Sequence, residues 1–546
     1  MNTLDHDTCY QAVTRRDPRF DGRFYTAVTT TGIFCRPSCP ARTPKTTNVR
    51  FYRHAAAASD AGFRPCRRCR PELAPGHPEW NRRSDLTGRA LKLIEGGTVD
   101  RIGVSGLAAQ LGVSERHLRR ELQSSVGTGP LPLARARRLW LARLLLDQTS
   151  LPITEVAFAA GFSSVRQFND SMRKAFDAPP SALRRRVGTD PTATTVTLQL
   201  PARGPLRWSA LHAFLAARAI PGFESASENG FRRQVDGGWI ELSGPLVATP
   251  TANAVGSGAG NSGVSGAEVP GSRVTGSEAA TVDEGATLTL TCALDQLSAL
   301  AELLPIVRRV ADLDTDLEPI EAHLGADPTL AQRLQQTPLA RLPGAFDPFE
   351  IAIRAVVGQQ ISVAGARTLL GRLVEMTSNG PTGTRCGFPS AEQVAESSLD
   401  ELGMPGRRRA TILGLARAVA DGQLELGPHV DPDQARHDLQ ALPGIGPWTA
   451  GYVVMRALSD PDGWPVGDLA LRRSLGCSAR ELEQRAATWS PWRAYAALTL
   501  WRSDPTQIRP STNDKPKPSA SKHSNDKTQK RQKRPRPKQV GREGQP

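Results

Sequence analysis

The chain has 546 residues, of which 39% are hydrophobic, and carries a formal net charge of +15 at pH 7. Its length exceeds what one hydrophobic core can organise, so we expect three or four domains joined by linkers. No apolar run approaches the roughly 20 residues that span a bilayer, and the N-terminus lacks the apolar core of a secretion signal. These features argue against a membrane partner or export. They favour a cytoplasmic, nucleoid-associated protein that binds a polyanion such as nucleic acid.

Residues 1–78 carry two close pairs of cysteines among many arginines and prolines. The pairs are Cys35 with Cys39 and Cys66 with Cys69, separated by three and by two residues. Two short knuckles of this kind can close a tetrahedral Zn²⁺ site. In a cytosolic protein such pairs indicate a metal before a disulfide. On spacing alone, the site can be purely structural and bind zinc without doing chemistry.

The residues around these cysteines change that interpretation. They form the segments GIFCRPSCPAR (32–42) and GFRPCRRC (62–69). Both segments resemble the N-terminal zinc domain of the Ada family of bacterial adaptive-response proteins, and the resemblance covers nearly all of residues 1–78. It implies that Cys35 takes a methyl group from a methylphosphotriester in DNA. Five nearby arginines are candidate phosphate contacts: Arg36, Arg42, Arg64, Arg67 and Arg68.

The charge of the zinc–thiolate set makes such a transfer a plausible switch. Zinc holds cysteine ligands as thiolates near neutral pH, and the thiolate is the nucleophile. Four thiolates on Zn²⁺ carry a net charge of −2, and methylation of one of them leaves −1. Because a negative charge beside the DNA backbone is then lost, we expect methylation to raise DNA affinity.

Residues 86–187 have helical periodicity and contain two similar helix-turn-helix patterns. The first is LAAQLGVS (107–114) followed by a helix over 115–123, with Gly112 suited to the turn and Ser114 to the N-cap. The second is ITEVAFAAGFSS (153–164), which continues to residue 176. A long helix over 133–147 is expected between them. A single pattern of this kind often serves packing alone.

Paired units on a connecting helix resemble the DNA-binding domain of AraC-type regulators. The resemblance places side chains of each second helix near the major groove. They are Glu115, Arg116 and Arg119 in the first unit and Ser164, Arg166 and Gln167 in the second. The order of domains in the Ada family would next predict a methyltransferase with a Pro-Cys-His-Arg site. This tetrapeptide is absent from the sequence, so repair of O6-methylguanine is not expected.

Residues 192–340 mix short alternating strands with helices, which predicts an α+β lobe. Strands are expected at 196–200 and 287–290, and helices at about 209–219 and 294–310. Residues 251–280 interrupt the lobe. Their seven Gly, five Ser and lack of aromatic residues predict a flexible insertion.

Helical periodicity returns in residues 341–503, where two motifs follow one another. The segment DLQALPGIGPWTA (438–450) predicts a helix, a tight hairpin and a second helix. The hairpin amides can face a DNA phosphate at the helix N-terminus. Asp468 follows 22 residues after Gly446, in VGDLA (466–470). By itself, Asp468 would be an ordinary helix cap.

Together, the hairpin and Asp468 resemble the helix-hairpin-helix base-excision glycosylases of the 3-methyladenine glycosylase II (AlkA) type. The resemblance covers about residues 192–503 and includes GQQIS (358–362) and PWRAY (491–495). It implies DNA contacts from Leu442, Gly444, Ile445 and Gly446. It also implies a base pocket of Trp448, Tyr452 and Trp501, whose electron-rich faces suit cationic alkylated purines. Core packing of these aromatic side chains is the alternative.

The resemblance assigns catalysis to Asp468. A carboxylate stabilises the positive charge that develops on the deoxyribose as the base leaves, and it can orient the attacking water. Trp448 stands where bifunctional relatives carry a Schiff-base lysine, so we expect hydrolysis that leaves the strand uncut. Gln360 stands where relatives place an apolar wedge. Whether Gln360 or Ile361 fills the gap left by a flipped nucleotide stays open.

Residues 504–546 hold 12 Lys/Arg against 4 Asp/Glu and few apolar residues, which predicts a disordered basic tail. The sequence as a whole therefore predicts five parts: a four-cysteine zinc domain (1–78), an all-α double helix-turn-helix (86–187), a mixed α/β lobe (192–340), an all-α helix-hairpin-helix core (341–503) and the tail.

The expected function is DNA alkylation repair together with its regulation. Asp468 would excise alkylated bases, and methylation of Cys35 would activate a transcription factor. We expect one Zn²⁺, no organic cofactor, and double-stranded DNA and RNA polymerase as partners. Two alternatives stay open: a regulator whose glycosylase half is inactive, and a repair enzyme whose zinc domain only targets DNA.

Overall fold

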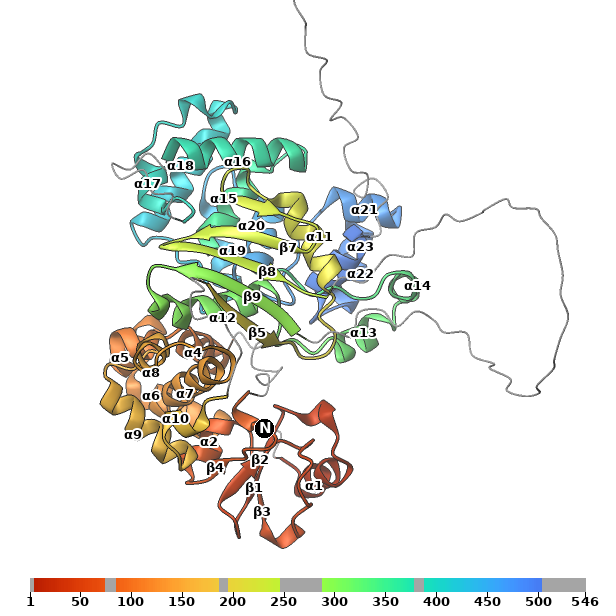
Figure 1. Cartoon of the computed structure of the whole chain (residues 1–546). Helices are drawn as coiled ribbons and strands as arrows, with labels where there is room; N and C mark the ends of the chain where they lie inside the picture. Colours follow the sequence, from red (N-terminus) through yellow and green to blue (C-terminus); the bar gives the residue numbers. More distant parts are fainter. Residues whose placement is uncertain (1–3, 74–84, 186–194, 246–286, 378–386, 503–546) are drawn as a thin grey trace, which may run out of the picture. The chain divides into compact units, whose positions relative to one another are not determined.

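The computed structural model describes residues 4–73, 85–185, 195–245, 287–377 and 387–502 (Figure 1). The predicted insertion at 251–280 and the predicted basic tail at 504–546 lie outside these residues. In the part of the chain that is described, no helix is long and apolar enough to cross a membrane.

The N-terminal part is a small sheet flanked by short helices. It contains α1 (His6–Arg15), β1 (Tyr25–Val28), β2 (Ile33–Cys35), β3 (Val49–Tyr52), α2 (Ala55–Asp60) and β4 (Arg64–Pro65), with 3-10 turns at Pro18–Phe20, Thr46–Asn48 and Pro71–Leu73. The strand order is β3-β1-β2-β4, and β2 and β4 run parallel with Phe34 opposite Pro65. The sheet therefore brings the two cysteine knuckles together, because Cys35 ends β2 and Cys66 directly follows β4.

The second part is all-α and contains both predicted helix-turn-helix units. Its helices are α4 (Leu86–Glu95), α5 (Thr98–Gln110), α6 (Glu115–Val126), α7 (Pro130–Gln148), α8 (Ile153–Ala159), α9 (Val165–Phe176) and α10 (Pro180–Leu183). Ser114 and Ser164 cap α6 and α9 by accepting from the backbone N–H of His117 and Gln167, both at 3.2 Å. Helix α5 is broken at Gly103, whose φ of 71° and ψ of −176° are not helical.

The α+β lobe is built on a five-stranded antiparallel sheet. Its elements are β5 (Val196–Pro201), α11 (Trp208–Arg218), β6 (Glu224–Ala226), β7 (Gly230–Val235), β8 (Gly238–Ser243), β9 (Thr287–Leu294), a 3-10 turn (Leu297–Ala299) and α12 (Leu300–Val310). The strand order is β5-β9-β8-β7-β6, and α11 packs against β6 and β7 (Figure 1). Leu288, Leu290 and Cys292 of β9 are fully buried, which fits the alternation expected of a one-sided strand.

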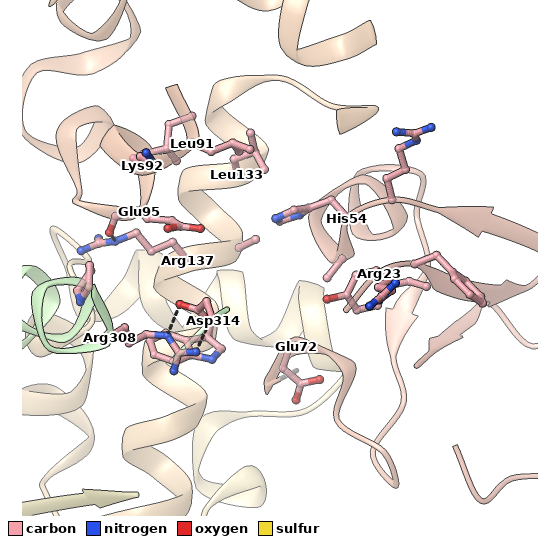
Figure 2. Close-up of a pocket in the computed structure, with 18 of the residues that line it drawn as sticks. Arg23, His54, Glu72, Leu91, Lys92, Glu95, Leu133, Arg137, Arg308 and Asp314 are labelled. Carbon is pink, nitrogen blue, oxygen red and sulfur yellow. Dashed lines mark hydrogen bonds and ion pairs between the residues drawn. The ribbon is translucent and has the colours of Figure 1, made fainter. Parts of the chain in front are cut away.

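Helix α12 begins later than expected, and its C-terminal end is tied to the loop that follows it. We expected a helix from residue 294, but Leu294 is the last residue of β9, paired with Gly238, and the helix begins at Leu300. Pairing with β8 extends the strand to Leu294, and a 3-10 turn at Leu297–Ala299 precedes the helix. Near its C-terminus, α12 is tied to the following loop by a two-pronged ion pair of Arg308 with Asp314 (Figure 2).

The last part is a helical core around α15. It comprises α13 (Glu318–Leu324), α14 (Pro328–Gln336), α15 (Pro348–Val357), α16 (Val363–Thr377), α17 (Ala391–Glu396), a 3-10 turn (Asp400–Leu402), α18 (Gly406–Ala420), α19 (Pro432–Ala441), α20 (Pro447–Ala457), α21 (Leu469–Leu475), α22 (Ala479–Thr488) and α23 (Arg493–Arg502). Helix α15 packs against α16, α18 and α20 (Figure 1). Leu317, Ile320 and Leu330 share a buried cluster with Met455, Leu471, Trp489 and other residues of the C-terminal helices.

A buried ion network joins the sheet of the lobe to α15. Arg233 of β7 pairs with Glu224 of β6 at 2.5 Å and with Glu350 of α15. Arg354, one turn after Glu350, pairs with Glu350 at 2.6 Å and with Glu224 at 2.8 Å. Both carboxylates and Arg233 are almost completely buried, so each charge depends on the others for compensation.

Candidate functional site

The four cysteines form one compact cluster. Their sulfur atoms all lie within 4.8 Å of one another, and the Sγ atoms of Cys39 and Cys66 are 4.0 Å apart. Zinc with four Zn–S bonds of about 2.3 Å in a tetrahedron requires S–S separations of about 3.8 Å. The cluster therefore fits Zn²⁺ in both size and ligand chemistry.

Cys35 differs from the other three cysteines in its exposure. Cys39, Cys66 and Cys69 are buried, with 8%, 8% and 3% of their surface exposed, whereas Cys35 is only partly buried. Of these four cysteines, Cys35 is therefore the least buried residue.

An aspartate holds the first cysteine knuckle in shape. Asp21 accepts hydrogen bonds from the Ser38 N–H at 3.0 Å and from the Ser38 hydroxyl at 2.6 Å. Its carboxylate also lies 3.5 Å from the guanidinium of Arg36, which lowers the charge that Arg36 can offer to a phosphate. The other candidate phosphate contacts are exposed: Arg42, Arg64, Arg67 and Arg68.

The predicted base-contacting side chains lie on the outer faces of α6 and α9. Leu118, Leu122 and Val126 turn one face of α6 inward, and Phe168, Met172 and Phe176 do the same for α9. Arg116, Arg166 and Gln167 are exposed on the opposite faces. Arg119 pairs with Glu115 one turn away at 3.3 Å, and the Gln167 side-chain oxygen accepts from the Ser163 hydroxyl at 3.0 Å.

The predicted hairpin lies between α19 and α20. Gly444 has a φ of +92°, and a Cβ placed there would lie 2.0 Å from Oγ1 of Thr411 on α18. The Thr411 hydroxyl donates to the Pro443 carbonyl at 3.1 Å. Ile445 is 5% exposed and anchors the turn in the core, while Leu442 is half-buried. Gly446 is the exposed N-cap of α20, and a Cβ there would meet nothing within 4 Å.

Asp468 is indeed the N-cap of a helix, but its carboxylate has two further partners. Its Oδ1 accepts from the Leu471 N–H of α21 at 2.8 Å and from the Trp501 indole N–H at 3.2 Å. Its Oδ2 accepts from the Trp448 indole N–H at 2.6 Å. The residue is 6% exposed. The structure thus brings Asp468 together with two of the three predicted pocket aromatics.

The third aromatic, Tyr452, joins them through helical spacing. Trp448, Tyr452 and Arg456 follow one another at four-residue steps on one face of α20. The Trp448 and Tyr452 rings stack at 5.5 Å, and the Tyr452 and Trp501 rings are tilted at 6.3 Å. Arg456 donates to the Tyr452 hydroxyl at 2.9 Å. Burial raises the pKa of Tyr452, but Arg456 and Arg218 outweigh it and lower that pKa.

The loop before α16 lies against the hairpin. Gln359 donates from its side-chain nitrogen to the Gly444 carbonyl at 3.1 Å and to the Thr449 hydroxyl at 3.0 Å. The next residue, Gln360, is exposed and has a φ of +57°, in the left-handed region. Four of the seven exposed large hydrophobic side chains in the described ranges flank this loop or Asp468: Ile361, Val363, Val466 and Leu469.

Comparisons with known proteins agree with this arrangement. Three family models match the chain: the metal binding domain of Ada at residues 8–72, a helix-turn-helix domain at 107–186 and the AlkA N-terminal domain at 197–347. Over 512 residues the chain is 44% identical to the "Probable bifunctional transcriptional activator/DNA repair enzyme AlkA" of Mycobacterium tuberculosis strain H37Rv. That alignment covers 91% of this chain and 96% of the relative. The chain belongs to this family of bifunctional activator and repair proteins.

Two further relatives each match a different part of the chain. DNA-3-methyladenine glycosylase 2 of Escherichia coli K12 is 29% identical over 312 residues, which cover 55% of this chain and 95% of that protein. The bifunctional transcriptional activator/DNA repair enzyme Ada of the same strain is 40% identical over 161 residues, or 29% of this chain and 43% of that protein. The Ada-type and AlkA-type resemblances drawn from the sequence are confirmed, as is the multidomain α and α+β fold class.

Sequence reasoning gave no role to three residues that contact the hairpin or the aromatic row: Arg456, Gln359 and Thr411. Arg456 could have been found, because it continues the helical row of Trp448 and Tyr452. Gln359 lies in the GQQIS motif but was given no role, and Thr411 gave no signal, because their partners in the hairpin lie 85 and 32 residues away in the chain. Both residues shape the hairpin through hydrogen bonds that only the fold creates.

Proposed function

We propose that the C-terminal half of the chain hydrolyses the N-glycosidic bond of alkylated bases in DNA, of the 3-methyladenine type, with Asp468 as the catalytic residue. The observation that carries this proposal is the buried Asp468 carboxylate, held beside three aromatic rings just past a helix-hairpin-helix. The family and the glycosylase relative support it.

The chemistry follows from the charges. As the C1′–N bond breaks, its electron pair leaves with the base and positive charge develops on the sugar. The Asp468 carboxylate stabilises that charge, and water adds at C1′ with loss of a proton. A cationic alkylated purine is attracted to the electron-rich faces of Trp448, Tyr452 and Trp501. Trp448 has no amine for a Schiff base, so the product is an abasic site in an uncut strand.

The first prediction tests this role. Asp468→Asn keeps the shape of the side chain but removes its negative charge, so base release should fall roughly 10²–10³-fold. DNA binding should persist because the hairpin is unchanged. The measurement is release of free base from methylated DNA, with the strands resolved on gels before and after alkali.

The same assay distinguishes the alternatives. A wild-type protein that releases no base would favour a regulator whose glycosylase half is inactive. Strand cleavage without alkali, or an Asp468→Asn variant as fast as wild type, would contradict the assigned roles of Trp448 and Asp468.

We further propose that Cys35 accepts a methyl group from a methylphosphotriester. A zinc ion bound by Cys35, Cys39, Cys66 and Cys69 would keep these thiols deprotonated near neutral pH. The Cys35 sulfur attacks the methyl carbon, the S–C bond forms, the C–O bond breaks, and the phosphodiester leaves with the electron pair. The partial exposure of Cys35 beside three buried cysteines supports this choice of sulfur.

Methyl transfer would then regulate DNA binding. Loss of one negative charge beside the backbone raises affinity for double-stranded DNA. Arg116 on α6, with Arg166 and Gln167 on α9, would contact bases at a promoter. RNA polymerase is the partner that such an activator would recruit.

The second prediction concerns Cys35. After exposure to methylated DNA, mass spectrometry should find one added methyl group, on Cys35 alone. Methylated protein should bind its operator more tightly than unmethylated protein at fixed salt, and Cys35→Ser should abolish this difference while zinc is retained. A methyl group on another residue, or none, would overturn the sensor. Transfer to Cys35 with no change in affinity would leave a repair protein without a switch.

A further inference from the structure

The carboxylate of Asp468 is held by neutral hydrogen-bond donors alone. Two of them are indole N–H groups, from Trp448 and Trp501, and the third is the Leu471 backbone N–H. Among the residues that the structure describes, Asp468 forms no ion pair with Lys, Arg or His. An arginine or lysine would hold the carboxylate equally well but would cancel the negative charge that a sugar cation needs.

The three donors are shared unevenly between the two oxygens. Oδ1 accepts from both Leu471 and Trp501, at 2.8 and 3.2 Å. Oδ2 accepts from Trp448 at 2.6 Å. Loss of the Trp501 indole would therefore leave Oδ1 with its backbone donor. Loss of the Trp448 indole would remove the short bond to Oδ2, and the carboxylate could then rotate about its helix-cap bond.

The indole bonds also fix the rings. With its N–H edge held by Asp468, Trp448 stacks its face on Tyr452, with an interplanar angle of 7°. Trp501 is held by the same carboxylate, and its ring is tilted by 55° to that of Tyr452. One hydrogen-bonded group therefore orients both the charge and the aromatic surface of the site.

We infer that Trp448 and Trp501 are positioning residues for the Asp468 carboxylate, in addition to any contact their rings make with a base. The inference rests on the proposed glycosylase function and deepens it. Uncharged indole donors hold the carboxylate in place while leaving its full negative charge for the sugar. Trp448 contributes more than Trp501 to holding the carboxylate, because the other two donors both bind Oδ1 and Trp448 binds Oδ2.

The chain offers a matched control for the loss of an indole. Trp464, which precedes α21, donates its indole N–H to Glu483 of α22 at 3.0 Å and is 3% exposed. Trp464→Phe removes a bond of the same chemical kind from the same part of the protein. It leaves Asp468 and its three donors in place.

The third prediction compares Trp448→Phe, Trp501→Phe and Trp464→Phe in single-turnover base excision at constant pH. A charge-assisted hydrogen bond is typically worth about tenfold to a hundredfold in an equilibrium or rate. We expect a loss of this size in maximal rate for Trp448→Phe and a smaller one for Trp501→Phe.

Trp464→Phe removes the indole partner of Glu483 and not of Asp468, so its maximal rate should stay close to that of wild type. If Trp464→Phe and Trp448→Phe lower the maximal rate equally, the inference is overturned.

A second readout does not depend on catalysis. In ¹⁵N-labelled full-length protein at constant pH, the indole N–H resonances of Trp448 and Trp501 should both shift when Asp468→Asn removes the charge of the group that accepts their hydrogen bonds. The Trp464 resonance should not follow. Indole resonances that ignore Asp468→Asn would overturn the inference even in an active enzyme. If both indole resonances shift in Asp468→Asn but this variant excises bases as fast as wild type, the proposed function is contradicted and the positioning of the carboxylate is not.

Discussion

Gly444 is the residue on which the geometry of the hairpin depends. Its φ of +92° lies in the region that residues with a Cβ rarely adopt, and its Cα faces Thr411 so closely that a methyl group would overlap Oγ1. Thr411 in turn donates to the carbonyl of Pro443, directly before Gly444. Helix α18 can therefore approach the hairpin this closely only because Gly444 has no side chain.

The fourth prediction follows at this position. Gly444→Ala should destabilise the protein by at least about 2 kcal/mol, because it adds left-handed strain to a steric overlap. DNA binding should weaken with it, since the hairpin must move. Gly414→Ala on α18 is the control: a Cβ there meets nothing within 4 Å, and alanine favours helix. Denaturant titration and DNA titration of both variants check this. Equal stability of the two variants would contradict the argument.

Single residues were predictable where chemistry demands a fixed spacing. The four cysteines could be selected from their two knuckles, and the structure places their sulfur atoms together. Asp468 could be selected through the resemblance to helix-hairpin-helix glycosylases, in which an aspartate follows the hairpin. The indole partners of Asp468 could not, because Trp501 lies 33 residues beyond it and nothing in the sequence reveals the direction of an N–H group. The roles of Cys35 and Asp468 stay predictions.

At the scale of elements, local chemistry predicted the helix-turn-helix units well. Ser114 caps α6 as expected, and Gly112 has the positive φ of 69° that the turn requires. Ser164 and Gly161, with a φ of 85°, hold the corresponding positions in the second unit, where no cap or turn residue had been predicted. The break of α5 at Gly103 was not foreseen. A glycine inside an apolar helical pattern is tolerated often enough that the sequence does not distinguish a kink from a continuous helix.

The strands illustrate where periodicity misleads. Residues 294–299 contain leucines that fit a helix, yet Leu294 closes β9 and Leu297–Ala299 forms a 3-10 turn before α12. Strand β9 is held by pairing with β5 and β8, which lie far from it in the sequence. Such long-range pairing overrides local preference, so the beginning of α12 could not be found from the sequence.

At the scale of the whole molecule, composition and motif order predicted a fusion, but not what holds its repair half together. The sequence offers no reason to connect Arg233 with Glu350, which are 117 residues apart. In the structure they form the centre of the buried network between β6, β7 and α15. Burial raises the pKa of Glu350, but Arg233 and Arg354 outweigh it and hold that pKa at about 2.

The fifth prediction uses this network. Because the pKa of Glu350 is lower in the folded protein than its ordinary value of 4.5, the ionised carboxylate stabilises the fold above pH 4.5. That contribution is lost as the pH falls from about 4.5 towards 2. Glu350→Gln leaves Arg233 and Arg354 with one carboxylate fewer. It should therefore lower the free energy of unfolding by about 3–5 kcal/mol near neutral pH. The difference in the free energy of unfolding between wild type and Glu350→Gln should then become smaller as the pH falls.

The measurement is urea unfolding of the full chain between pH 3 and 7. Tryptophan fluorescence reports on the relevant part, because seven of the nine tryptophans lie between Trp208 and Trp501. Glu241→Gln is the control, since Glu241 pairs with Arg232 on the exposed face of the same sheet. A surface pair contributes about 0–1 kcal/mol, so this variant should stay close to wild type at every pH. A cost of Glu350→Gln that does not change with pH would show that the arginines do not hold Glu350 in its ionised form.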